Sequence, residues 1–219
     1  TAGIGGNSAA TREGAESSKI YMVGNILMDT LRFNHQRFAR PAVMDNLGLT
    51  EKRYIVFTLN RKAIIGNDDE LRALLVSMMS HTGDIPVVAP LRQLAADAVQ
   101  CIVNENPLLF ENLHIVEPLD YLHFGYLTAN ALGVVTDSGN VAEEATFNTV
   151  PCITLNSYTE HIETVKVGSN VLVGEDPVLL GEEMARMVDG KWKHCGIPER
   201  WDGRSAERIV QTLLECAAK

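Results

Sequence analysis

Residues 134–145 read Val-Val-Thr-Asp-Ser-Gly-Asn-Val-Ala-Glu-Glu-Ala, and this stretch indicates the fold. The β-branched run ending at Thr136 predicts a buried strand, and the acidic segment after residues 137–139 has the pattern of a helix. A strand that turns sharply into a helix brings free N–H groups and the positive end of the helix dipole to one point. That point suits a diphosphate, while Glu143 and Glu144, one turn further, can accept hydrogen bonds from ribose hydroxyls.

Runs typical of strands alternate with runs typical of helices along the chain. The expected strands are Ile20–Val23, Tyr54–Thr58, Ile85–Ala89, Leu113–Val116, Leu132–Thr136, Cys152–Leu155 and Asn170–Val173. The expected helices are Leu27–Phe38, Asp68–Ser80, Leu91–Asn104, Tyr121–Ala129, Val141–Phe147, Pro177–Val188 and Ser205–Ala218. This alternation predicts an α/β fold with a doubly wound parallel sheet of Rossmann type. Its buried residues should include Ile55, Val56, Val87, Val88, Ile115, Val134, Val135 and Ile153.

Composition narrows the possible classes of protein. The 219 residues are 46% hydrophobic, which is enough for one sizeable core. A net charge of −9 argues against nucleic acid as a partner. No apolar run has the length of a membrane span, and no signal-peptide pattern opens the sequence. The four cysteines form no CxxC pair and the histidines have no metal spacing, so we expect reduced thiols in the cytoplasm, no metal and no cofactor.

Several segments, taken in order, resemble the motifs of one family. Residues 23–29, 117–124, 136–145, 159–174 and 201–210 are similar to VGNTxxD, EPxxYxxF, TDSGGxQEEA, TERPxTxxxGTNxLVG and WDGKAAERIV. Each motif alone is weak, whereas the ordered set is specific. It resembles the non-hydrolysing UDP-N-acetylglucosamine 2-epimerases, which have the GT-B fold, and the resemblance runs from about residue 13 to the end.

The resemblance implies two Rossmann-like domains with a UDP-sugar in the cleft between them. This chain resembles the hinge and the C-terminal half of that architecture. The expected divisions are a loose lead-in (1–18), a hinge strand and helices (19–48), a UDP-binding domain (49–188), and a linker with the last helix (189–219). The acidic residues thought to transfer protons would lie in the N-terminal domain, which is an expected partner. A homodimer is left open.

The resemblance also implies a reaction and a set of binding residues. The family eliminates UDP to give a 2-acetamidoglucal and adds it back on the opposite face. The UDP-binding residues would be Ser138, Gly139, Asn140, Glu144, Phe124 and Arg61.

Most of these residues have a plainer alternative, and for Gly139 it is an ordinary turn between a strand and a helix. Ser138 can be an ordinary helix cap, and Glu144 a solvated carboxylate in the first turn. Phe124 can be a core residue rather than a platform for uracil, and Arg61 can be solvated. For Glu143 the structural role is the favoured one.

The chain departs from the family motifs at several positions. Asn60 stands where the family has His, and Ala63 where it has Glu. Asn140 replaces a Gly, while His161 and Ile162 replace Arg and Pro. An asparagine side chain cannot act as acid or base, so no catalytic residue is assigned in this chain. Replacing Arg by His removes a permanent cation.

Three hypotheses remain open at this level. The first is the UDP-binding half of an epimerase. The second is a GT-B glycosyltransferase that uses a nucleotide sugar, because it would hold the same half of the donor. The third is a non-catalytic protein that binds UDP-sugars, which the Asn60 and Ala63 departures favour.

Overall fold

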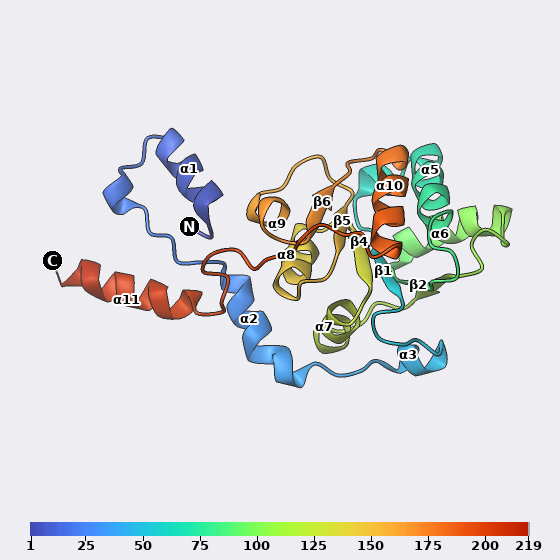
Figure 1. The fold of residues 1–219 in the computed structure, drawn as a ribbon, viewed down its shortest axis with the longest axis horizontal. Helices are drawn as coiled ribbons and strands as arrows, with labels where there is room; N and C mark the ends of the chain where they lie inside the picture. The colour runs from blue at the N-terminus through green and yellow to red at the C-terminus, as the bar shows by residue number, and fades with distance from the viewer. Residues whose placement is uncertain (219) are drawn as a thin grey trace.

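The structure is a computed structural model that describes residues 1–218. Its centre is a parallel sheet of six strands in the order β3-β2-β1-β4-β5-β6 (Figure 1). The strands are β1 (Ile55–Thr58), β2 (Val87–Pro90), β3 (Leu113–Val116), β4 (Gly133–Thr136), β5 (Cys152–Thr154) and β6 (Asn170–Leu172). The sequence prediction of a doubly wound parallel sheet is confirmed. The strand order reverses between β1 and β4, and such a switch point opens a crevice at the carboxyl ends of the strands.

Helices cover both faces of this sheet (Figure 1). The helices of the described chain are α1 (Ile4–Arg12), α2 (Ile26–Asn34), α3 (Ala42–Asn46), α4 (Lys62–Ile65), α5 (Asp68–Met79), α6 (Gln93–Glu105), α7 (Tyr121–Ala129), α8 (Gly139–Phe147), α9 (Glu163–Lys166), α10 (Pro177–Val188) and α11 (Ser205–Ala217). Helices α5, α6 and α10 pack on one face through Leu75, Val99 and Met184. Helices α3, α7 and α8 pack on the other. Two apolar clusters therefore fix the direction in which α8 leaves β4.

The core agrees closely with the expected set of residues. All of that set except Ile115 are fully buried. Ile115 is partly exposed because its strand, β3, lies at one edge of the sheet.

Helices α2 and α11 form a separate packing unit, here called the α2–α11 unit, that lies beside the sheet with both chain ends (Figure 1). The indole of Trp201 is fully buried and clusters with Met28 and Leu31 of α2. The carboxylate of Asp29 accepts hydrogen bonds from the backbone N–H groups of Ser205 (3.0 Å) and Ala206 (2.9 Å). A carboxylate at that position caps the start of α11 and complements its dipole.

The N-terminal segments differ from expectation. Residues 4–12 form helix α1, not a loose lead-in. Residues 20–23 belong to no strand in the described chain; Tyr21 instead lines a groove together with Ile209 and Leu213 of α11. The Tyr21 hydroxyl lies 3.6 Å from the sulfur of Cys216, so this run lies alongside α11 instead of pairing with a strand.

Some helix bounds also differ. The helix expected to reach Phe38 ends at Asn34 and continues as a short 3₁₀ turn, residues 35–37. Helices α3, α4 and α9 were not predicted, because four or five residues are too few to show a helical period.

The packing predicts a clear contrast between two leucines. Leu75 of α5 is 1% exposed in the larger cluster, and Leu94 of α6 is 60% exposed. Leu75→Ala should lower the free energy of unfolding by about 2–5 kcal/mol through lost burial and a cavity. Leu94→Ala, the matched control, should change it by less than about 0.5 kcal/mol. Chemical denaturation measures both values, and equal losses would contradict this assignment of the core.

Candidate functional site

The loops after β1, β4 and β5 are tied together at the switch point. Asp137, 7% exposed, accepts hydrogen bonds at Oδ2 from the backbone N–H groups of Asn60 (2.7 Å) and Arg61 (2.5 Å). The side-chain amide of Asn156 donates to the carbonyl oxygen of Asp137 (3.1 Å). The hydroxyls of Thr58 and Thr136 lie 2.6 Å apart on the paired strands. These contacts fix the floor of the crevice.

Helix α8 begins at this crevice. Ser138 is its N-cap, and the Ser138 hydroxyl lies 3.5 Å from the N–H group of Val141. The Thr136 hydroxyl accepts from the N–H group of Ser138 (3.0 Å), which sets the turn. Gly139 and Asn140 are exposed, and a Cβ added at Gly139 would meet no atom within 4 Å. The first N–H groups of a helix have no partner inside the helix, so they can be offered to an anion here.

Both glutamates of α8 are buried. Glu143 and Glu144 are each 8% exposed, which excludes a solvated carboxylate at Glu144. Burial, with a smaller contribution from the charge of the neighbouring Glu143, raises the pKa of Glu144 to about 7. Burial also raises the pKa of Tyr121, with a smaller effect from the charge of Glu144. A buried carboxylate is stabilised by any hydroxyl donors that a ligand brings.

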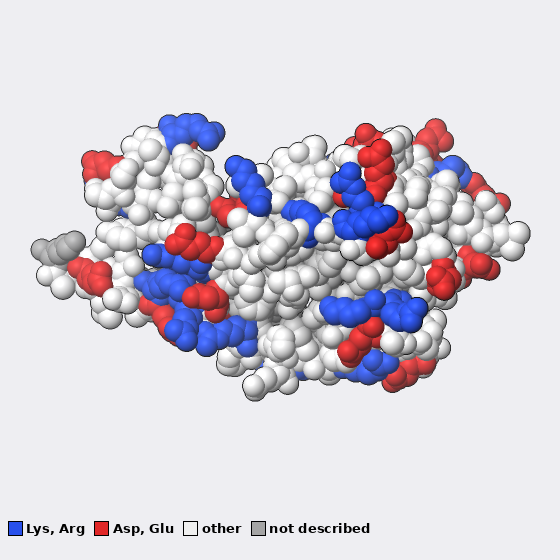
Figure 2. Space-filling model, viewed as in Figure 1, with Lys and Arg blue, Asp and Glu red and all other residues white. Residues whose placement is uncertain are grey.

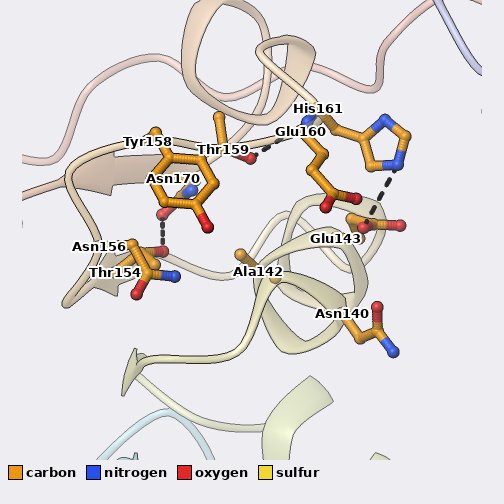
Figure 3. Close-up of a pocket in the computed structure, with 11 residues that line it drawn as sticks. Asn140, Ala142, Glu143, Thr154, Asn156, Tyr158, Thr159, Glu160, His161 and Asn170 are labelled. Atoms are coloured by element: carbon orange, nitrogen blue, oxygen red, sulfur yellow. Dashed lines mark hydrogen bonds and ion pairs between the residues drawn. The ribbon is translucent and has the colours of Figure 1, made fainter. Parts of the chain in front are cut away.

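Glu143 lines a polar pocket between α8 and residues 154–161 (Figure 3). The pocket measures about 240 Å³. Figure 3 shows the His161 imidazole directed at Glu143, and their atoms Nε2 and Oε1 are 3.6 Å apart. The other oxygen of Glu143 accepts from the side-chain amide of Asn25 (2.5 Å). Burial raises the pKa of Glu143, and the Asn25 hydrogen bond opposes this shift.

Sequence reasoning missed part of this pocket. Its lining also includes Asn156, Tyr158, Thr159 and Glu160. Thr159 and Glu160 belong to the TERP-like motif, which was the available signal. Asn156 and Tyr158 lie outside any quoted motif.

The other residues singled out from the sequence differ in burial and in their distance from the start of α8. The Arg61 guanidinium donates to the carbonyl oxygen of Leu155 (2.8 Å) and pairs with Glu175 (2.5 Å). It is therefore anchored and not simply solvated. Phe124 is partly buried against the cluster that includes Leu127, so one part of its ring is core. Asn60 is exposed at the crevice. Ser138, Gly139 and Asn140 come together, whereas Arg61 is held toward the loop after β5.

Other kinds of site find no support in residues 1–218. Within that range no three His, Cys, Asp or Glu side chains are grouped so that they could hold a metal ion. No helix in the same range is long and apolar enough to cross a membrane. On the face drawn in Figure 2, basic and acidic side chains are interspersed among the described residues.

Comparison with known proteins identifies the family. The sequence profile of the UDP-N-acetylglucosamine 2-epimerases matches residues 7–214. The chain belongs to this family. It is 33% identical over 213 residues to a UDP-N-acetylglucosamine 2-epimerase of Methanocaldococcus jannaschii, covering 92% of this chain and 56% of the relative. It is also 33% identical over 202 residues to a UDP-2,3-diacetamido-2,3-dideoxy-D-glucuronate 2-epimerase of Pseudomonas aeruginosa, covering 91% and 54%.

Solved structures of the 2-epimerases resemble the fold. The M. jannaschii UDP-GlcNAc 2-epimerase in complex with UDP-GlcNAc and UDP gives a TM-score of 0.73 at 29% identity, covering 94% of this chain and 58% of that one. A Staphylococcus aureus structure with UDP gives 0.80 at 23% identity, covering 97% and 57%, and supports the fold alone. The chain thus spans a little over half the length of these 2-epimerases.

The buried Glu144 predicts a pH-dependent stability for this member of the family. Its pKa rises from the ordinary 4.5 to about 7 in the folded state, so the folded chain binds the proton more tightly. The stability from this group is present below about pH 4.5 and is lost as pH rises through about 7. Between pH 5 and 8 the free energy of unfolding should fall on the order of 1–3 kcal/mol more for the parent than for Glu144→Gln.

Glu182→Gln is the matched control, because Glu182 is exposed on α10. Its stability should follow the parent at every pH. Urea denaturation across the pH range gives the three curves, and parallel curves for the parent and Glu144→Gln would contradict the buried, protonated carboxyl.

Proposed function

We propose that this chain is the UDP-binding half of a UDP-N-acetylglucosamine 2-epimerase. One observation carries the proposal: α8 begins, with Ser138 as its cap, at the switch point of a parallel sheet in a chain of this family. Helix N-termini at switch points bind phosphates through free N–H groups and the helix dipole. The M. jannaschii relative, whose structure is similar, is a complex with UDP-GlcNAc and UDP.

The proposed binding mode divides UDP among three groups of residues. The diphosphate meets the backbone at Ser138, Gly139 and Asn140. The ribose hydroxyls donate to Glu144, and these hydrogen bonds stabilise its buried carboxylate. The uracil stacks on the exposed part of Phe124. Arg61 contributes positive charge at the edge of the site while it stays paired with Glu175.

The proposed role in the reaction is to stabilise the leaving group. UDP departs as an anion during elimination, and fixed donors at α8 stabilise the charge that develops on its phosphate. The proton transfers at the sugar require groups that titrate, and the Asn60 side chain does not. We propose that these groups come from a further domain of the whole protein, which closes the site from the other side.

The proposed UDP contacts also fit a second UDP-sugar. The chain has the same sequence identity, 33%, to the P. aeruginosa 2-epimerase for a diacetamido glucuronate as to the M. jannaschii enzyme. The two named substrates share UDP and differ in the sugar. The residues proposed here contact only UDP, so they fit either substrate.

The proposal also includes the cellular location of the protein. All four cysteines are free thiols. Free thiols persist in reducing compartments. We therefore propose that the protein is cytoplasmic.

Two variants test the binding mode. UDP should bind the chain with a Kd of about 0.1–1 mM, since one domain alone leaves the site open to water. Glu144→Ala should weaken UDP at least about tenfold, by the loss of about 1.4 kcal/mol or more of ribose contacts, and leave pyrophosphate unchanged. Ser138→Ala, the comparison variant, should weaken both ligands.

Amide chemical shifts recorded during titration with each ligand give these affinities and the location of binding. Parent-like UDP affinity in Glu144→Ala, or shifts that lie away from residues 138–144, would show that the ribose and phosphate sites are misassigned.

Activity provides a separate test. The 219-residue chain alone should not interconvert UDP-GlcNAc and UDP-ManNAc. General acids and bases each contribute roughly 10²–10⁴-fold, so a chain without them at the sugar should show no measurable turnover. An NMR time course, with the complete M. jannaschii enzyme as a positive control, measures this. Epimerisation by the chain alone would contradict the proposal that the proton-transfer groups lie in a further domain.

A further inference from the structure

Glu143 contacts two segments that lie far from it in sequence. One carboxylate oxygen accepts from Asn25 and the other lies near His161. A buried carboxylate is costly unless it is hydrogen-bonded, so these contacts are strongly favoured over leaving the charge alone. Glu143 therefore connects α8 with the elements that Asn25 and His161 contact.

Asn25 holds the start of α2. Its side-chain oxygen accepts from the N–H group of Leu27 (2.9 Å) and caps the helix, while its amide donates to Glu143. Asn25 is 5% exposed, so its amide has little water to replace Glu143. Farther along α2, Asp29 caps α11. Helix α2 is thus hydrogen-bonded to α8 at its start, through Asn25, and to the start of α11 through Asp29.

His161 reaches the same unit by a second route. Its ring meets the indole of Trp201 edge-on, with centroids 5.9 Å apart and planes at 85°. Trp201 packs on Met28 and Leu31 of α2. Both contacts of Glu143 therefore end on the α2–α11 unit.

The start of α8 lies one turn before Glu143. Asn140 and Glu143 line the same pocket and belong to the same helix (Figure 3). A ligand that orders the first turn of α8 also orders the carboxylate one turn further on. Contacts that depend on that carboxylate are then stabilised at the same time, which is how two sites become coupled.

We propose that Glu143 is a positioning residue that couples UDP bound at the start of α8 to the α2–α11 unit. This inference rests on the proposed function, because UDP at α8 is the ligand. The coupling passes through the Asn25 hydrogen bond, with the His161–Trp201 contact as a second support. Helix α11 carries the C-terminal end of the described chain, so the position of that end responds to the nucleotide (Figure 1).

Hydrogen exchange of the 219-residue chain, with and without saturating UDP, tests this coupling. In the parent, UDP should slow exchange at least twofold in residues 139–147, 26–34 and 205–217. Glu143→Ala should keep the protection of residues 139–147 and lose it in the other two segments. Glu143→Gln should regain it in residues 26–34, because its amide oxygen still accepts from Asn25.

Glu183→Ala is the matched control, since Glu183 is an equally buried carboxylate on α10 that pairs with Arg186 instead (2.8 Å). It should behave as the parent does. UDP protection of residues 26–34 that survives in Glu143→Ala would overturn the coupling. If Glu143→Ala does not fold, Glu143→Gln decides: loss of protection in residues 26–34 while 139–147 stays protected would overturn the role given to the Asn25 bond.

The parent chain separates this inference from the proposed function. Protection of residues 139–147 without any change in residues 26–34 and 205–217 would overturn the coupling alone. No protection of residues 139–147 by UDP would overturn the nucleotide site and the coupling together.

Discussion

The carboxylate of Asp137 holds the two sides of the crevice together. It accepts the backbone N–H groups of Asn60 and Arg61, so the loop after β1 is fixed against the turn after β4. Hydrogen bonds to a charged group are worth about 1.5–3 kcal/mol each, and two on one oxygen define a narrow geometry. Without them the start of α8 would face a loose loop, and the free N–H groups would have no fixed crevice in which to hold an anion.

Helix α8 contains two buried carboxyl groups whose charges destabilise the folded chain. Glu143 and Glu144 are adjacent, both are buried, and burial raises the pKa of each. Two neighbouring buried carboxyls reduce stability, and pairs of this kind concentrate at functional sites. Their partners differ: Glu143 is satisfied within the chain by Asn25, whereas the proposed partner of Glu144 is the ribose. This difference separates a positioning role from a binding role on consecutive residues.

The sequence was sufficient for features that depend on neighbouring residues. The β-branched run at Val134 and Val135 and the cap at Ser138 predict the strand, the turn and the helix because each signal is local. Pairings across the chain could not be predicted in this way. Asn25 and Glu143 are 118 positions apart, and the pattern around each gives no indication of the other. Residues 20–23 show the same limit, since a short apolar run fits a strand and a helix-packing segment equally well.

A crystal structure of the chain grown with UDP is the most direct test of whether UDP occupies the crevice at the start of α8. We predict diphosphate oxygens within hydrogen-bond distance of the backbone N–H groups of residues 138–140, ribose hydroxyls on Glu144 and uracil against Phe124. A structure with UDP confined to the pocket beside His161, or with the ribose on Glu143, would contradict it.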